Sequence, residues 1–163
     1  MKDRIKIITG PIRSGKTTYL KKLISSLDNV EGIIQIADGG KRFFVDISSG
    51  DQIELTSQSR NSDTFNMGNF IFRKSAFTWA KEKLEISLKK RYTIIAIDEY
   101  GLLEFRGEGL EPLFSEIINQ TKLNVERQLL VVVREALLKD FLKKFNLNEN
   151  EIKIEKIVDN ISQ

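Results

Sequence analysis

The sequence predicts a three-layer α/β fold with a mostly parallel sheet, on three observations. Short apolar segments alternate with segments of helical periodicity along the 163 residues. Two of the apolar segments, 94–97 and 129–133, have no polar residue at all, which is typical of parallel strands buried on both faces. A glycine-containing loop at 10–17 follows the first strand and precedes the first helix. Parallel strands connected through helices are the arrangement that this order favours.

The first half of the chain predicts a strand, a helix and a group of short strands. Residues 5–9 are β-branched and end at Gly10, and residues 17–27 carry apolar side chains at helical spacing. Three β-like pieces at 33–36, 43–47 and 52–55 are separated by turn-forming residues, which predicts a small antiparallel meander inserted after the first helix. The polar stretch 56–69 predicts a mobile loop that could act as a lid.

The second half continues the alternation of helices and strands. Periodicity predicts helices at 74–90, 110–123 and 135–145, and strands at 92–97, 129–133 and 152–158. The chain has no internal repeat, low-complexity segment or linker, so we expect residues 1–163 to form a single domain. Four aromatic residues around the start of the 74–90 helix are expected in the core rather than against a base: Phe70, Phe72, Phe77 and Trp79.

The amino-acid composition excludes several classes of catalytic and metal-binding chemistry. The chain has neither cysteine nor histidine, which excludes disulfides, thiol catalysis and thiolate zinc sites. Acid–base and metal chemistry must therefore use carboxylates, hydroxyls, lysine, arginine and the backbone, a set that suits magnesium and phosphate. The 26 Lys and Arg and 23 Asp and Glu are interleaved and leave a net charge of only +3. Nucleic acid is accordingly not expected as a partner.

The apolar run near the N-terminus is too short for a signal-peptide core, and no apolar stretch approaches the roughly 18 residues of a membrane span. We therefore expect a cytoplasmic protein without a membrane partner, and a monomer by default.

The loop at 10–17 satisfies the phosphate-binding pattern G-x-x-x-x-G-K-[ST] in full and has the strand and helix context that the pattern requires. Backbone N–H groups of such a loop surround phosphate oxygens, and the free N–H groups and dipole of the following helix add to the attraction. Lys16 is expected to neutralise the β and γ phosphates, Thr17 to bind magnesium and Thr18 to lie beside the α-phosphate. The alternative is a glycine turn that merely caps a helix. The predicted nucleotide-binding residues are Gly10, Pro11, Ile12, Arg13, Ser14, Gly15, Lys16, Thr17 and Thr18.

Two carboxylates and an arginine follow the two wholly apolar strands. Asp98 and Glu99 come after the strand at 92–97, at the sheet edge where α/β proteins bind nucleotides. Asp98 is expected to hold magnesium and Glu99 to activate the attacking water, unless the pair simply ends a buried strand in solvent.

Arg134 follows the next apolar strand and is a candidate for contact with the γ-phosphate. It could instead cap the following helix or pair with Glu135. Arg60 and Arg106 are weaker candidates with undefined roles.

These segments resemble the small P-loop nucleoside-triphosphatases of bacteria and archaea that are related to the human cancer-related nucleoside-triphosphatase. The resemblance covers most of the chain and rests on residues 8–18, 32–34, 40–42, 68–72, 97–104 and 131–134. It implies a RecA-like core, Mg²⁺ dependence and hydrolysis of ATP, GTP and other nucleoside triphosphates to diphosphate and phosphate with broad base tolerance. Gly101 and Glu104 become site-shaping positions, although Glu104 could instead hold a neighbouring loop. Tyr100 and Leu102 depart from the family pattern, in positions that could alter how water is placed.

Two further functions share the phosphate loop. A small-molecule or nucleotide kinase needs an acceptor pocket and usually an arginine-bearing lid, and the loop at 56–69 offers Arg60 alone. A nucleotide-dependent switch or binding module would use hydrolysis only to reset a partner interaction. A Ras-type GTPase is disfavoured because no Asn-Lys-x-Asp motif is present.

Overall fold

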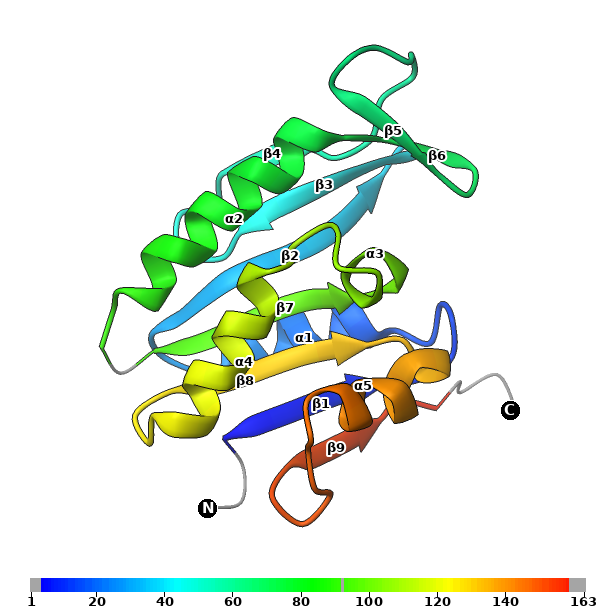
Figure 1. The fold of residues 1–163 in the computed structure, drawn as a ribbon. Helices are drawn as coiled ribbons and strands as arrows, with labels where there is room; N and C mark the ends of the chain where they lie inside the picture. Colours follow the sequence, from blue (N-terminus) through cyan, green and yellow to red (C-terminus); the bar gives the residue numbers. More distant parts are fainter. Residues whose placement is uncertain (1–3, 92, 159–163) are drawn as a thin grey trace.

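The computed structural model describes residues 4–91 and 93–158, and its centre is a seven-stranded sheet (Figure 1). The strand order is β4-β3-β2-β7-β8-β1-β9, and all pairings from β2 to β9 are parallel. The mostly parallel α/β sheet that the sequence predicts is therefore confirmed. The strands are β1 Ile5–Thr9, β2 Val30–Asp38, β3 Lys41–Asp46, β4 Gln52–Glu54, β7 Ile94–Tyr100, β8 Gln128–Val133 and β9 Lys153–Lys156.

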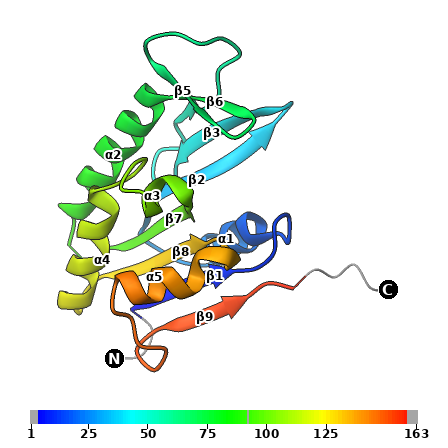
Figure 2. The same cartoon turned by 45° about the vertical axis from the view of Figure 1, so that its right-hand side comes forward.

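Helices cover both faces of the sheet and complete the three layers (Figures 1 and 2). Helix α1, Lys16–Ser25, lies on one face, where Leu20 packs in a small apolar cluster with Ile8 and Ala96. Helices α2, Lys74–Leu88, α4, Leu113–Leu123, and α5, Leu138–Lys144, enclose the larger core on the other face. Residues 135–137, predicted as the start of a helix, form a 3₁₀ turn that leads into α5.

Alternation along the central strands explains their wholly apolar sequences. In β7, Ile95 and Ile97 belong to the larger core, whereas Ala96 between them faces α1. In β8, Leu129, Val131 and Val133 likewise face the larger core, and the residues between them face α1. Each such buried aliphatic side chain stabilises the fold by about 1.5–3 kcal/mol through removal from water. The prediction that these strands are buried on both faces is confirmed.

The parallel order brings three separate segments to one edge of the sheet. Strand β8 lies between β1 and β7, so the strand before the 10–17 loop and the strand carrying Asp98 are not neighbours. All three strands nevertheless run in the same direction, and their carboxyl ends meet at one edge. Asp98 and Glu99 lie within β7, which extends to Tyr100, rather than after a strand as predicted. The predicted start of this strand, Tyr92, lies outside the described residues.

A β-bulge changes the direction of the side chains at the end of β7. Asp98 pairs with Val132 and Tyr100 with Val133, which leaves Glu99 as an extra residue without a partner on β8. In a regular strand Asp98 and Tyr100 would point to the same face. Here Asp98 contacts α1 through Thr17, whereas Tyr100 is buried in the larger core on the opposite face. The bulge thus places the acid and the aromatic ring on opposite sides of the sheet.

The prediction of an irregular loop at 56–69 is wrong for its second half. Residues Thr64–Met67 form strand β5, which pairs antiparallel with β6, Phe70–Arg73, in a hairpin beside the start of β3 (Figures 1 and 2). Phe65 packs 6.0 Å from Phe72 and 5.8 Å from Phe77, measured between ring centroids. Four alternating residues give too short a pattern to recognise, and their order depends on rings from β6 and α2. The predicted antiparallel meander β2-β3-β4 is confirmed, with β2 also paired to β7.

Candidate functional site

The 10–17 loop is held in a shape that glycine makes possible. Gly15, which directly precedes α1, has φ of 89°, a left-handed conformation that side chains disfavour. A Cβ on Gly10 would come within 2.5 Å of the Ile157 carbonyl oxygen, so a larger residue would displace the backbone after β9. No side chain caps the N-terminus of α1, which leaves its first backbone N–H groups available to an anion.

Two polar side chains of this loop are suited to phosphate. Lys16 Nζ donates to the carbonyl oxygens of Gly10 at 3.0 Å and Pro11 at 2.6 Å, so the ammonium group folds back over its own loop. The Ser14 hydroxyl oxygen is buried and has no hydrogen-bond partner among the described residues. Phosphate oxygens would offer acceptors to both groups. At the tip of the loop, Ile12 is 78% exposed.

Thr17 and Asp98, both predicted as magnesium ligands, are in direct contact. Thr17 Oγ1 donates to Asp98 Oδ2 at 2.9 Å, and the backbone N–H of Gln35 donates to the same oxygen at 3.3 Å. Asp98 is only 2% exposed, and this burial raises its pKa to about 6, against the opposing effect of the two hydrogen bonds. A bound cation would favour the charged carboxylate that burial disfavours.

The donors at this point fit Mg²⁺. Both are oxygens, the ligand type that a small hard cation prefers. The described residues contain no group of three or more His, Cys, Asp or Glu that could enclose a metal. Magnesium commonly keeps several waters and takes its other ligands from phosphates, so one hydroxyl and one carboxylate are enough protein ligands here.

Glu99 and Arg134 form an ion pair at the same sheet edge. Arg134 Nε donates to Glu99 Oε1 at 3.0 Å, and the two side chains are 42% and 26% exposed. Of the alternatives left open for Arg134, pairing with Glu135 is not seen, because Glu135 pairs with Lys156 at 2.8 Å. The structure therefore brings together the two residues predicted for water activation and γ-phosphate contact.

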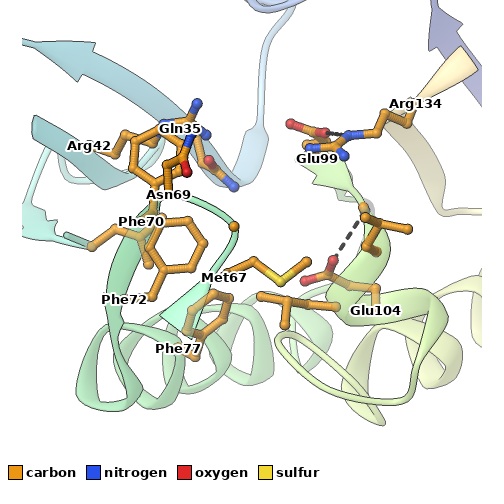
Figure 3. Close-up of a pocket in the computed structure, with 15 residues that line it drawn as sticks. Gln35, Arg42, Met67, Asn69, Phe70, Phe72, Phe77, Glu99, Glu104 and Arg134 are labelled. Atoms are coloured by element: carbon orange, nitrogen blue, oxygen red, sulfur yellow. Dashed lines mark hydrogen bonds and ion pairs between the residues drawn. The ribbon is translucent and has the colours of Figure 1, made fainter. Parts of the chain in front are cut away.

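Beside this pair lies a cavity of about 290 Å³ that the sequence did not predict (Figure 3). One wall carries Glu99 and Arg134, and the opposite wall comes from β2, β3 and the β5–β6 hairpin. Its residues come from separate segments, and no spacing in the sequence connects them. The residues lining the cavity include Gln35, Arg42, Met67, Asn69, Phe70 and Phe77.

The aromatic residues assigned to the core divide between two environments. Phe72 and Phe77 are each 7% exposed and belong to the larger core, as predicted. Phe70 is only partly buried and lines the cavity, with the Arg42 guanidinium 4.3 Å from its ring centroid. Trp79 is also partly buried and packs against the core.

Glu104 lines the same cavity and holds the backbone beside it. It is 5% exposed and accepts hydrogen bonds from the backbone N–H groups of Gly101 at 3.1 Å and Leu110 at 3.2 Å. Burial raises its pKa. These contacts fix α3, Leu102–Phe105, a helix that the sequence did not predict. The predicted alternative that Glu104 holds a neighbouring loop agrees with these contacts, although backbone hydrogen bonds replace a salt bridge.

Of the two departures from the family pattern, Leu102 lines the cavity beside Glu99, whereas Tyr100 lies in the core. Tyr100 is fully buried among aromatic rings, 4.8 Å from both Phe114 and Phe141, so the core accommodates its size. Arg60 and Arg106 are exposed and form no ion pair within residues 4–91 and 93–158. Neither lines the cavity beside Glu99.

Comparison with known proteins gives one family and one fold. A family model described as NTPase matches residues 6–160. The crystal structure of THEP1 from the hyperthermophile Aquifex aeolicus is similar, with a TM-score of 0.71, 18% sequence identity, and coverage of 97% of this chain and 90% of that one. No curated protein sequence matches this chain. Within the described residues, no helix has the length and apolar character needed to cross a membrane.

Proposed function

This chain belongs to the NTPase family, and we propose that it hydrolyses nucleoside triphosphates to diphosphate and phosphate with Mg²⁺ as cofactor. We expect ATP and GTP among its substrates, with broad base tolerance. The observation that carries the proposal is that two adjacent carboxylates at the β7 bulge lie in different surroundings. Asp98 is buried against Thr17 on the α1 side, while the next residue, Glu99, borders an open cavity.

Nucleotide binding follows from the loop and the first turn of α1. The free N–H groups of α1 and the loop backbone would surround the phosphates, with Thr18 beside the α-phosphate. Lys16 would exchange the Gly10 and Pro11 carbonyls for β- and γ-phosphate oxygens, because an ammonium binds an anion more strongly than a carbonyl dipole. Thr17 and Asp98 would hold Mg²⁺, which when bound neutralises phosphate charge.

In this proposal Glu99 accepts a proton from the attacking water. A water beside it would lose a proton to the carboxylate as its oxygen bonds to the γ-phosphorus and the bond to the β-phosphate oxygen breaks. Arg134 keeps further N–H donors beyond the one given to Glu99. These donors are suited to the charge on the γ-phosphate oxygens in the transition state. The cytoplasmic location and monomeric state stay predictions from the sequence.

The test is phosphate release from a panel of nucleoside triphosphates, with and without Mg²⁺, for the wild type and Glu99→Gln. The variant should bind nucleotide as tightly as the wild type and lose turnover by about 10²–10⁴-fold, because the amide cannot accept the proton. Glu108→Gln, a change at an exposed position outside the cavity, is the matched control. Unchanged turnover in Glu99→Gln would remove this residue from the mechanism.

A further inference from the structure

The cavity beside Glu99 is larger than hydrolysis requires. A single water occupies about 30 Å³, whereas the cavity measures about 290 Å³. This volume lies near the lower end of the range for small-molecule sites, which begins at about 300 Å³. The space beside the proposed base therefore fits a small organic molecule rather than the attacking water alone.

Three polar side chains that line the cavity form no hydrogen bond or ion pair with the residues that the structure describes. Neither Gln35 nor Asn69 forms a side-chain hydrogen bond with the described residues, and Arg42 forms no ion pair with them. The contact found for the Arg42 guanidinium is the face of Phe70, 4.3 Å away. All three lie on the wall opposite Glu99 and Arg134 in Figure 3. Together they present amide donors, amide acceptors and one cation to whatever enters.

The floor of the cavity is apolar and aromatic. Met67, Phe70, Phe72 and Phe77 line it below the polar side chains, as Figure 3 shows. Aromatic and thioether surfaces bind flat rings well. Amide groups above such a surface can read the hydrogen-bonding edge of a heteroaromatic ring, as Asn and Gln read adenine. The combination is suited to a nucleobase.

We propose that this cavity binds a nucleoside, with the base on the aromatic floor and a sugar hydroxyl at Glu99, and that the hydroxyl accepts the γ-phosphate. The proposal rests on the proposed function, because the same bound nucleotide supplies the phosphoryl group. The acceptor oxygen bonds to the γ-phosphorus as the bond to the β-phosphate oxygen breaks. The hydroxyl proton passes to Glu99, and the nucleoside diphosphate leaves. When no nucleoside occupies the cavity, water takes the place of the hydroxyl and the nucleotide is hydrolysed.

A hydroxyl acceptor agrees better with the site than a phosphate acceptor does. A hydroxyl must lose its proton during transfer, and Glu99 is placed to take it. A nucleoside monophosphate is already anionic, needs no base and would be repelled by the Glu99 carboxylate. Arg42 and Arg134 are the cations among the lining residues, and Arg134 is already paired with Glu99. The cavity therefore offers little positive charge to hold the phosphate of a nucleoside monophosphate.

The experiment incubates the full-length chain with Mg²⁺ and ATP and each of adenosine, guanosine, cytidine and uridine. Nucleoside monophosphate is measured by mass spectrometry, and ADP and inorganic phosphate are measured in parallel. We expect at least one nucleoside to yield its monophosphate, with ADP formed in excess of phosphate. Equal ADP and phosphate without any monophosphate would overturn the proposed transfer.

Two variants with matched controls test whether the cavity is the acceptor site. Arg42→Met keeps an apolar cover on Phe70, and Asn69→Ala shortens an exposed side chain, so neither should prevent folding. Each should raise the KM for the nucleoside about tenfold, as expected for one lost hydrogen bond, and leave nucleoside-free hydrolysis within about twofold. Arg60→Met and Asn66→Ala, at exposed positions outside the cavity, should change neither value.

Nucleoside binding without ATP, measured by equilibrium dialysis, separates this proposal from the proposed function. Saturable binding that Arg42→Met weakens supports the cavity even if the protein fails to hydrolyse nucleotides. Hydrolysis with no saturable nucleoside binding at millimolar concentration overturns the cavity and leaves the proposed function standing. Formation of diphosphates from added monophosphates, with nucleosides inert, would overturn the hydroxyl acceptor in favour of a phosphate acceptor.

Discussion

Arg134 Nε donates to Glu99 Oε1 at 3.0 Å and so connects the end of β8 to the bulge of β7. The Arg134 side chain is 42% exposed, and an ion pair this accessible stabilises a fold by less than about 1 kcal/mol. The pair can therefore open at little cost to stability. A bound γ-phosphate, with more negative charge than Glu99, is a competing partner for the same guanidinium.

We expect Arg134→Ala to lower turnover by about 10²–10³-fold with little change in the temperature of unfolding, because the lost donors act on the transition state. Phosphate release and thermal unfolding measure the two effects. Arg106→Ala, at an exposed position, is the control and should leave both unchanged. Wild-type turnover in Arg134→Ala would contradict a role for this residue in charge stabilisation.

The raised pKa of Asp98 makes nucleotide-free stability depend on pH. Because the folded pKa of about 6 exceeds the ordinary 3.8, stability is fully present below about pH 3.8 and is lost as pH rises through 6. The difference corresponds to about 3 kcal/mol above pH 6. Asp98→Asn, whose amide oxygen can accept both hydrogen bonds now made by Oδ2, should therefore stabilise the nucleotide-free protein at pH 8.

Urea unfolding of wild type and Asp98→Asn at pH 4.5 and pH 8 checks this expectation. The variant should gain stability at pH 8 and lose most of that advantage at pH 4.5. It should also lose Mg²⁺-dependent turnover, since a neutral amide binds the cation less well. If the substitution instead lowers stability equally at both pH values, folding does not raise the pKa of Asp98.

Substitutions at the neighbouring residues Thr17 and Thr18 test the proposed metal site. Thr17→Val keeps the shape of the side chain but removes the hydroxyl that contacts Asp98. We expect it to lower Mg²⁺-stimulated turnover by about 10²-fold or more, because the cation contributes several kcal/mol to the transition state. Thr17→Ser should retain most activity, and Thr18→Val, at an exposed position, should affect turnover far less. A magnesium titration of phosphate release distinguishes these outcomes.

Lys16→Ala tests the phosphate loop itself. Loss of its ammonium removes charge-assisted hydrogen bonds worth about 1.5–3 kcal/mol each, so nucleotide affinity should fall at least about tenfold. Titration with a fluorescent nucleotide measures this, and Lys22→Ala near the end of α1 is the control. Retained tight binding in Lys16→Ala would contradict the assignment of the loop.

Glu104→Ala should destabilise the fold. The change leaves the buried N–H groups of Gly101 and Leu110 without their acceptor, at a cost of about 2 kcal/mol or more. Glu108→Ala, at an exposed position, should be close to neutral. Chemical denaturation measures both, and equal stability of the two variants would show that water replaces the carboxylate at these groups.

Sequence patterns predicted the fold where the signal was local and strong. The apolar strands at β7 and β8, the loop before α1 and the β2-β3-β4 meander each follow from spacing within a few neighbouring residues. The β5–β6 hairpin was missed because its alternation spans four residues on each strand. Helix α3 was missed because Glu104, which caps it, acts through backbone groups on both sides.

The residue pattern alone predicts the phosphate loop and singles out Asp98, Glu99 and Arg134 as candidates, because each is marked by its position after an apolar strand. Which of these residues contact one another depends on how the strands and helices pack. The alternation of β7 directs Asp98 to the α1 face and to Thr17, the bulge turns Tyr100 to the opposite face, and the strand order brings Arg134 to Glu99. The cavity was also beyond the sequence, because Gln35, Arg42 and Asn69 meet only when β2, β3 and the hairpin pack together. Contacts between distant segments depend on packing, and no local pattern records them.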